Sequence, residues 1–382
     1  MSTQPTPQII SDAGNLAAAV ARLAAAGRVA LDTEAASFHR YTDRVYLVQL
    51  SSDDDTVLVD PLVAGDLAPI GALLADPGVE VVFHDADYDL RTLDRDYGFR
   101  ATRLFDTRVT AQLLGEPGIG LAALLEKYFG MRLDKKLQRA DWSARPLTPA
   151  MVAYAAADTM HLLALRDLLE RHLQEAGRLA WASEEFARLE EIRWTPPDRE
   201  SAHLQLRGAR TLSPRAKVVL GALYEWREVT ASSLDRPPFR VAASEALVAV
   251  AQASPTTAAA LHGVPGLPRP IARRYEAELL DAVQVGLRRE IVRTERSRSG
   301  SGRPDAATEA RVERLKELRN RRATGMNIEP GVLCPNATLL AIARATPRTP
   351  DDIAHVTELR GWQRQALTDE EILRTVAAGG SQ

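Results

Sequence analysis

Every segment with strong β-strand character lies before residue 107, and this uneven distribution limits the possible folds more than any other feature. Short apolar runs rich in β-branched residues occupy 28–32, 45–51, 56–59, 80–84 and 103–106. Helical patterns lie among and after them at 14–26, 86–96, 107–114, 121–129 and 148–175. Beyond Gly177 the chain is helical and is punctuated by Pro and Gly. This order predicts an α/β domain with a mixed five-stranded sheet flanked by helices, followed by an all-α region.

The all-α region divides into two units of similar design. Each has an Arg-rich first helix and a Pro-containing loop, followed by an apolar segment that begins near Glu245 in one unit and near Asn336 in the other. These shared features indicate a degenerate repeat, and the Ser-, Gly- and Arg-rich stretch between the units is typical of a flexible linker. A chain of 382 residues is also too long for a single hydrophobic core of ordinary size. We therefore expect an α/β domain at 10–192, helical units at 205–291 and 309–378, and a basic linker at 293–308.

The net charge of −3 hides an uneven distribution of charge along the chain. Residues 1–175 contain 17 Lys and Arg against 25 Asp and Glu, whereas residues 176–382 contain 31 against 26. Carboxylates that gather metal ions in the front half and basic groups that hold phosphates in the back half would produce this division. Ordinary variation in surface charge would produce it equally well.

The number of cysteines and the hydropathy of the chain indicate where in the cell the protein resides. Cys334 is the single cysteine, so no intrachain disulfide forms, and no Cys/His cluster has the spacing of a structural zinc site. No apolar stretch reaches the length that spans a bilayer, and the N-terminus lacks the pattern of a signal peptide. The sequence therefore predicts a cytoplasmic protein that does not enter membranes, and we expect a monomer.

Acidic residues recur in three segments that could form one site. The first segment places Asp32 and Glu34 two residues apart at the end of a strand pattern. In extended backbone such residues point to the same face, so both carboxylates can reach one cation. An isolated Asp-x-Glu also occurs at strand ends without any chemical role.

The second segment runs from a strand into a helix that has three acids near its start. We expect Asp85 or Asp87 to cap this helix and to interact favourably with its positive end. Capping does not account for Asp89, which lies one turn further along, so Asp89 is the candidate for a chemical role.

The third segment lies in the long helical pattern, where Thr148 and Pro149 form a plausible cap and first turn. A spacing of four residues puts Tyr154 and Asp158 on one helical face. The three alanines between them are small enough to let the helix approach the sheet closely. A packed tyrosine above an exposed aspartate is the alternative.

The three segments in this order resemble the DEDDy exonucleases of the DnaQ-like superfamily and, within that superfamily, ribonuclease D. The resemblance covers about residues 10–190 and is supported by the segments 105–107, 113–115, 121–129 and 141–148. The two helical units resemble HRDC domains, the first more clearly than the second.

The resemblance implies an RNase H-like fold and a metal-dependent 3′-to-5′ exonuclease activity. Its site would comprise Asp32, Glu34, Asp89, Tyr154 and Asp158, with the four carboxylates holding two divalent cations, Mg²⁺ or Mn²⁺, and the tyrosine orienting the attacking water. Two cations about 3.5–4 Å apart can stabilise both the attacking and the leaving oxygen of a phosphodiester. The expected partners are transfer RNA precursors and small structured RNAs, trimmed at their 3′ ends with release of 5′-nucleoside monophosphates.

Two other functions are compatible with these residues. A 3′-to-5′ DNA exonuclease in repair would share the same constellation, and a nucleic-acid-binding scaffold could retain the fold with a silent site. The pairing of an N-terminal exonuclease with two HRDC units, without a helicase P-loop, favours RNA. The presence of all five motif residues argues against the scaffold.

Basic and aromatic residues suggest how a nucleic acid would be held. Candidates for phosphate contacts are three residues in the loop before the third segment and four in the linker, namely Lys135, Lys136 and Arg139, and Arg293, Arg296, Arg298 and Arg303. Phe38, His39 and Tyr41 follow the first segment and are candidates for stacking on the terminal base. A solvated basic loop and aromatic packing beneath a loop are the respective alternatives.

Overall fold

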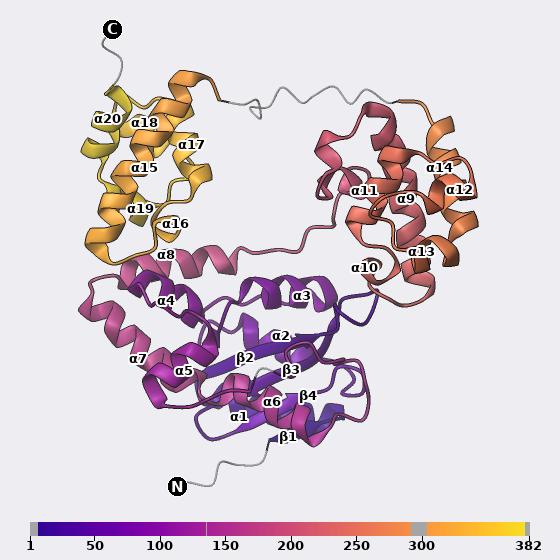
Figure 1. Ribbon diagram of the computed structural model, residues 1–382. Coiled ribbons are helices and arrows are strands. Elements are labelled where there is room, and N and C mark those ends of the chain that lie inside the picture. Colours follow the sequence, from indigo (N-terminus) through magenta and orange to yellow (C-terminus); the bar gives the residue numbers. More distant parts are fainter. Residues whose placement is uncertain (1–6, 135, 292–303, 379–382) are drawn as a thin grey trace.

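The structure is a computed structural model that describes residues 7–134, 136–291 and 304–378. It contains an α/β domain, a first helical unit at 202–288 and a second helical unit at 306–377 (Figure 1). None of the described helices combines the length and the apolar character needed to cross a membrane.

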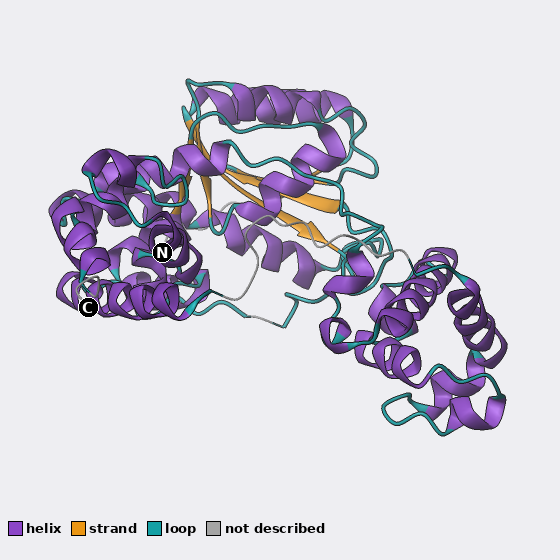
Figure 2. Cartoon of the chain, turned by 90° about the horizontal axis from the view of Figure 1, so that it is seen from above, coloured by secondary structure: helices purple, strands orange, loops and turns teal. Residues whose placement is uncertain are grey.

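A six-stranded mixed sheet forms the centre of the α/β domain, with helices on both of its faces (Figure 2). The strand order is β1-β4-β3-β2-β5-β6. β2 pairs antiparallel with β3 and parallel with β5, and β3 pairs antiparallel with β4. The strands are β1 (Gln8–Ile10), β2 (Arg28–Ala35), β3 (Val45–Ser51), β4 (Thr56–Val59), β5 (Glu80–Phe83) and β6 (Leu104–Asp106).

The prediction of five strands is corrected by β1, which pairs parallel with β4 at the edge of the sheet. β1 has three residues, of which Ile10 alone is buried, so it carries too little hydrophobic alternation to be recognised from sequence. The five predicted strands are confirmed with small differences in their bounds. The largest difference is at β2, which continues to Ala35 and therefore contains both Asp32 and Glu34.

Eight helices of the described α/β domain surround this sheet. They are α1 (Ala13–Ala25), α2 (Ala68–Ala75), α3 (Asp87–Tyr97), α4 (Thr107–Leu114), α5 (Leu121–Phe129), α6 (Pro149–Met160), α7 (Leu162–Glu175) and α8 (Leu179–Glu190). The single helix predicted over 148–175 is interrupted at His161, whose φ of −111° and ψ of 2° are not helical. Neither Pro nor Gly stands at this break, so the sequence gives no signal for it.

The two helical units are built from short helices. The first has η1 (Ala202–Gln205), η2 (Ala209–Thr211), α9 (Pro214–Ser233), α10 (Pro238–Val241), α11 (Ser244–Ala253), α12 (Ala258–His262), α13 (Arg269–Arg274) and α14 (Glu276–Arg288). The second has α15 (Ala306–Met326), α16 (Pro330–Leu333), α17 (Asn336–Ala345), α18 (Pro350–Ala354), α19 (Gly361–Leu367) and α20 (Asp369–Ala377).

The two units differ in how they join the rest of the molecule. The buried apolar side chains of the second unit are continuous with those of the sheet and of α4 and α7, so these regions share one core. The first unit encloses a core of its own. The shared core is sealed at α8, where the rings of Trp181 and Trp362 stack with centroids 5.1 Å apart. Glu185 accepts hydrogen bonds there from Trp362 Nε1 at 2.5 Å and from Arg360 at 2.6 Å.

Candidate active site

Asp32 and Glu34 project from the same face of the central strand β2. Alternation along β2 places their side chains on the face that also carries Ala30, whereas Thr33 points to the opposite face. Asp32 lies directly across from Gln49 in the antiparallel pairing with β3. Both carboxylates are partly buried, so they are positioned by the sheet rather than by a loop.

Helix α6 covers this face of the sheet and supplies the third acid. Its N-terminus is capped as predicted, because the Thr148 side chain accepts a hydrogen bond from Met151 N at 3.2 Å. Ala155 and Ala156 are buried against the sheet, which confirms that small residues permit a close approach. Near the other end of α6, the hydroxyls of Ser51 and Thr159 lie 2.7 Å apart.

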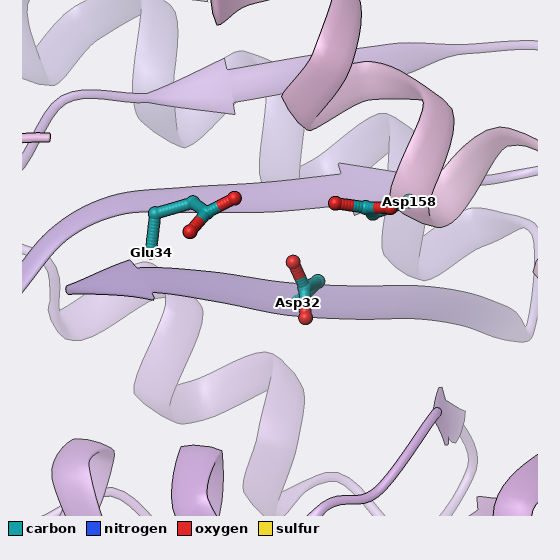
Figure 3. A group of neighbouring side chains, drawn as sticks. All are labelled: Asp32, Glu34 and Asp158. Atoms are coloured by element: carbon teal, nitrogen blue, oxygen red, sulfur yellow. The ribbon is translucent and has the colours of Figure 1, made fainter. Parts of the chain in front are cut away.

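Three of the predicted carboxylates meet between β2 and α6. Asp32, Glu34 and Asp158 each offer one oxygen, and these oxygens all lie within 4.8 Å of one another. Figure 3 shows Asp32 and Glu34 on the strand and Asp158 on the helix, directed toward a common space. Residues more than 120 positions apart in the chain are therefore brought to one point by the packing of α6 on the sheet.

Asp89 lies beside this group but outside the set of three. It stands in the first turn of α3 and is buried, with 6% of its surface exposed. The Thr33 hydroxyl donates a hydrogen bond to Asp89 Oδ1 at 2.5 Å. The Asp89 charge is close enough to raise the pKa of Glu34, so Asp89 belongs to the same electrostatic environment.

The predicted cap of α3 is wrong. The N-cap residue is Ala86, and neither Asp85 nor Asp87 caps the helix with its side chain. Instead Asp106, at the end of the neighbouring strand β6, accepts a hydrogen bond from Ala86 N at 2.8 Å. Asp85 pairs with Arg108 and Asp87 with Arg91 on the surface. A cap provided by another strand leaves no local pattern in the sequence.

The acidic groups destabilise one another's charged forms. Burial and then the charge of Asp158 raise the pKa of Asp32 well above its usual range. Burial, Asp32 and Asp158 raise the pKa of Glu34 to about 10, and burial raises the pKa of Asp158 to about 7. The pKa of Asp89 is also raised, by burial and by Asp32. Desolvation and like charges both act in this direction.

This donor set fits a divalent cation. It consists of carboxylate oxygens alone, which hard cations such as Mg²⁺, Mn²⁺ and Ca²⁺ prefer over nitrogen or sulfur. A cation would also neutralise the charges that now repel one another, which lowers the pKa of each ligand. The acidic cluster therefore indicates divalent-metal binding.

Tyr154 lies on α6 one turn before Asp158 and is partly buried. Its ring packs against that of Trp142, with centroids 5.9 Å apart. Burial and the charge of Asp158 raise the pKa of the Tyr154 phenol above its usual value near 10. The phenol therefore keeps its proton at neutral pH and can act as a hydrogen-bond donor rather than as a base.

Gln49 is a residue of this site that the sequence interpretation missed. Its side chain is fully buried, with 0% of its surface exposed. It lies opposite Asp32, and neither its amide oxygen nor its amide nitrogen has a hydrogen-bond partner in the described part of the chain. The alternation of side chains along β3 could have placed Gln49 on the buried face of the sheet. Its pairing with Asp32, however, depends on the register between β3 and β2, which the sequence does not reveal.

The structure describes two of the basic residues predicted to contact phosphates, Lys136 and Arg139. Arg139 lies over the ring of Phe38, with the guanidinium carbon 5.1 Å from the ring centroid. Lys136 is exposed and pairs with Asp134 at 3.3 Å. The remaining candidates, Lys135, Arg293, Arg296, Arg298 and Arg303, lie outside the described residues.

Two family models match regions of the chain. The model described as 3′-5′ exonuclease matches residues 7–174, and the HRDC domain model matches 216–283 and 308–376. The fold and the acidic site thus define a 3′-5′ exonuclease that carries HRDC domains.

Relatives that match nearly the whole chain identify the family within this class. Ribonuclease D of Granulibacter bethesdensis is 34% identical over 374 residues, which cover 96% of this chain and 92% of that protein. Ribonuclease D of Gluconacetobacter diazotrophicus is 33% identical over 371 residues. This chain belongs to the ribonuclease D family.

Solved structures agree with this assignment. The crystal structure of Escherichia coli RNase D, described as an exoribonuclease involved in structured RNA processing, matches with a TM-score of 0.74 and 25% identity. The match covers 99% of this chain and 100% of that one. The catalytic core of RRP6 from Trypanosoma brucei matches with a TM-score of 0.64 and 27% identity, over 75% of this chain and 84% of that one. The chain is a 3′-5′ exoribonuclease.

Proposed function

We propose that this exoribonuclease trims the 3′ ends of structured RNAs, transfer RNA precursors among them, and releases 5′-nucleoside monophosphates. The observation that carries this proposal is the convergence of Asp32, Glu34 and Asp158 within 4.8 Å, in a chain related throughout to ribonuclease D. The Escherichia coli relative, whose description names structured RNA processing, supports the choice of substrate.

In this proposal the carboxylates of Asp32, Glu34, Asp89 and Asp158 hold two divalent cations, Mg²⁺ or Mn²⁺. When bound, such cations activate water and neutralise charge on the phosphate that is cleaved. Asp32 and Glu34 on β2 and Asp158 on α6 would hold a cation together, since each offers an oxygen within 4.8 Å of the others. Asp89, fixed by Thr33, takes part from the side of α3.

Tyr154 positions the attacking water in this proposal. Its raised pKa keeps the hydroxyl protonated, and its packing against Trp142 fixes the direction of the ring. A protonated phenol can donate one hydrogen bond and accept another, so it orients a water without removing its proton. The reaction leaves a free 3′ hydroxyl on the shortened RNA, which is the substrate for the next cycle.

We further propose the division of the chain into functional segments. The catalytic domain occupies 10–192, the first HRDC domain 205–291 and the second HRDC domain 309–378, with a basic linker at 293–308. The family-model matches fall inside or near these limits. The linker arginines would contribute contacts to phosphates that do not depend on base sequence.

Matched RNA and DNA oligonucleotides, labelled at either end, test the proposed function together with one transfer RNA precursor. We expect stepwise 3′-end shortening of RNA in Mn²⁺ or Mg²⁺, mononucleotide products, and no reaction in EDTA.

Asp32→Asn should abolish hydrolysis, and Tyr154→Phe should lower kcat by about 10- to 100-fold with little change in KM. Internal cleavage of a circular RNA would contradict the proposal, and preference for DNA would favour a repair exonuclease.

A further inference from the structure

Two phenylalanines from different domains meet where the loop after β2 contacts the first helical unit. Phe38 follows β2 in the α/β domain, and Phe239 lies in α10 of the first helical unit. Their rings make an edge-to-face contact, with centroids 6.3 Å apart and planes inclined by 71°. An edge-to-face contact covers at most one face of one ring. Accordingly Phe38 remains 41% exposed and Phe239 52% exposed.

Polar contacts fix the loop that carries Phe38 against the first helical unit. Asp235 accepts a hydrogen bond from Tyr41 N at 3.2 Å and another from the Arg40 guanidinium at 3.0 Å. Arg40 also donates to the Ser143 hydroxyl at 2.6 Å. The two rings are therefore held together by a network beside them, so their apolar faces are not required for docking the domains.

The aromatic pair is connected to the catalytic residues by short stretches of chain. Phe38 lies four residues after Glu34, which limits the separation of their Cα atoms to about 14 Å. On the other side, Arg139 lies over Phe38 and precedes Trp142, whose ring packs on Tyr154. A nucleotide chain that leaves the carboxylates on the side of this loop would pass Phe38 and Phe239.

The charges around the pair suit an anionic chain. Arg139 is exposed and already stacks on Phe38, and it forms no ion pair with a carboxylate among the described residues. Arg236 and Arg240 flank Phe239 and are exposed. Aromatic rings with basic residues beside them are the usual means of holding single-stranded nucleic acid without reading its sequence.

We propose that Phe38 and Phe239 form a base-stacking clamp for the unpaired nucleotides at the 3′ end of the RNA. Arg139 contacts the adjoining phosphate. The first helical unit thereby contributes directly to the substrate site. This inference rests on the proposed function, because it assumes that a single-stranded RNA end enters between β2 and α6.

The test compares Phe239→Leu with Phe239→Trp on a short unstructured RNA. Leucine keeps an apolar contact with Phe38 but has no aromatic face, so we expect KM to rise about 5-fold or more, with kcat within about twofold. Tryptophan should restore KM. Phe129→Leu is the matched control, since Phe129 is a 38% exposed phenylalanine at the end of α5, far from the first helical unit (Figure 1). It should leave both constants unchanged.

Binding without cleavage provides a separate measurement. An RNA with 2-aminopurine at its 3′ end is titrated with protein in Ca²⁺, and stacking should quench its fluorescence in the wild type and in Phe239→Trp but less in Phe239→Leu. The clamp is refuted if Phe239→Leu matches the wild type in KM and quenching, or if leucine and tryptophan behave alike. Failure of the proposed function would appear differently, as absence of RNA hydrolysis by the wild type.

A second inference concerns Gln49 and has a separate basis. A buried amide without a partner is unfavourable, and this one stands on β3 directly opposite Asp32 on β2. Directly opposed residues in an antiparallel pair have Cβ atoms about 4.5–5.5 Å apart. We infer that Gln49 is a positioning residue whose amide N–H donates a hydrogen bond to the Asp32 carboxylate when that group binds a cation.

Manganese affinity measured by calorimetry in the absence of RNA tests the role of Gln49. Loss of a group that orients a metal ligand typically weakens metal binding by about 10- to 100-fold, which we expect for Gln49→Leu and for the alternative Gln49→Met. Gln363→Leu is the control, because Gln363 is fully buried in α19 and its amide nitrogen also lacks a partner within the described residues. Unchanged affinity in a folded Gln49 variant would refute the inference.

Discussion

The acidic residues of the site oppose folding when no cation is present. The carboxyl groups of Asp32, Glu34 and Asp158 have raised pKa values in the folded chain, so folding favours their protonated forms. In the unfolded chain the same groups ionise near pH 4. Ionisation of the folded protein at neutral pH therefore has a cost in free energy that a bound cation can offset.

Ionisation of Asp158 should make the free energy of unfolding depend on pH. Its pKa is about 7 in the folded protein and about 3.9 when unfolded. The stability that it contributes is full below pH 4 and is lost as the pH rises through about 7. Asp158→Asn cannot ionise, so at pH 8 in EDTA we expect it to melt above the wild type by roughly 2 to 4 °C per kcal/mol gained.

The control for this prediction is Glu126→Gln, which removes an acid with 55% of its side chain exposed, paired with Arg132 on the surface. It should change the melting temperature little at any pH. Added Mn²⁺ should stabilise the wild type at pH 8 and leave Asp158→Asn nearly unaffected. A variant that melts below the wild type in EDTA at pH 8 would show that the repulsion is not significant.

At the scale of residues, the sequence predicts the acidic residues of the site but not the polar residues that contact them. Asp32, Glu34 and Asp158 carry a recognisable spacing, and the structure brings them together. Gln49 is a neighbour only through the register of β2 and β3, and Thr33 meets Asp89 only through the packing of α3. Contacts of this kind depend on tertiary structure and leave no periodic pattern.

At the scale of elements, the placement of α6 decides the geometry of the site. The loop before α6 is tied to the sheet by Arg145, which donates two hydrogen bonds to Asp60, at 2.5 and 2.9 Å. The same guanidinium donates to the backbone oxygens of Tyr46 on β3 and of Trp142, at 2.8 and 2.7 Å. One side chain thus links the approach to α6 with β3 and with the residue that follows β4.

Arg145→Lys should show what this link contributes. A lysine keeps the charge but cannot form the paired hydrogen bonds to Asp60, whose side chain is 8% exposed. We expect a loss of about 1.5–3 kcal/mol in the free energy of unfolding. We also expect a lower kcat, because a shifted α6 moves Asp158 relative to Asp32. Urea denaturation and steady-state hydrolysis measure the two effects.

Arg132→Lys is the matched control for this substitution. Arg132 pairs with Glu126 at 2.9 Å, and the two side chains are 85% and 55% exposed, so the pair is expected to contribute little. Equal losses of unfolding free energy in the two variants would mean that the hydrogen bonds of Arg145 stabilise the fold no more than an exposed ion pair does.

Elements themselves are predicted well where their periodicity is strong. The bounds predicted for β3, β4, α4 and α5 agree with the structure. β1 was missed because three residues are too few to show alternation. The break between α6 and α7 was missed because no residue near His161 disfavours a helix strongly.

At the scale of the whole molecule, the sequence predicts two similar helical units, yet the structure joins them differently. The second unit shares a core with the sheet, α4 and α7, and Glu185 binds Trp362 and Arg360 across the boundary. The first unit has a separate core and meets the α/β domain mainly through the loop around Arg40 and Tyr41. Repeat similarity predicts a similar fold for the two units, whereas docking depends on the surface that each unit presents.

This difference predicts two cooperative unfolding units instead of three. Trp362 is 2% exposed at the boundary, so Trp362→Ala should cost about 3–5 kcal/mol and destabilise the second helical unit together with the α/β domain. Leu247 is 1% exposed in the separate core, and Leu247→Ala should destabilise the first unit alone. Amide hydrogen exchange followed by mass spectrometry distinguishes them: Trp362→Ala should accelerate exchange in α8 and α15–α20 together, while α9 and α14 keep the protection of the wild type. Acceleration confined to the second unit would mean that it folds independently of the catalytic core, and that the continuous apolar interior does not couple the two.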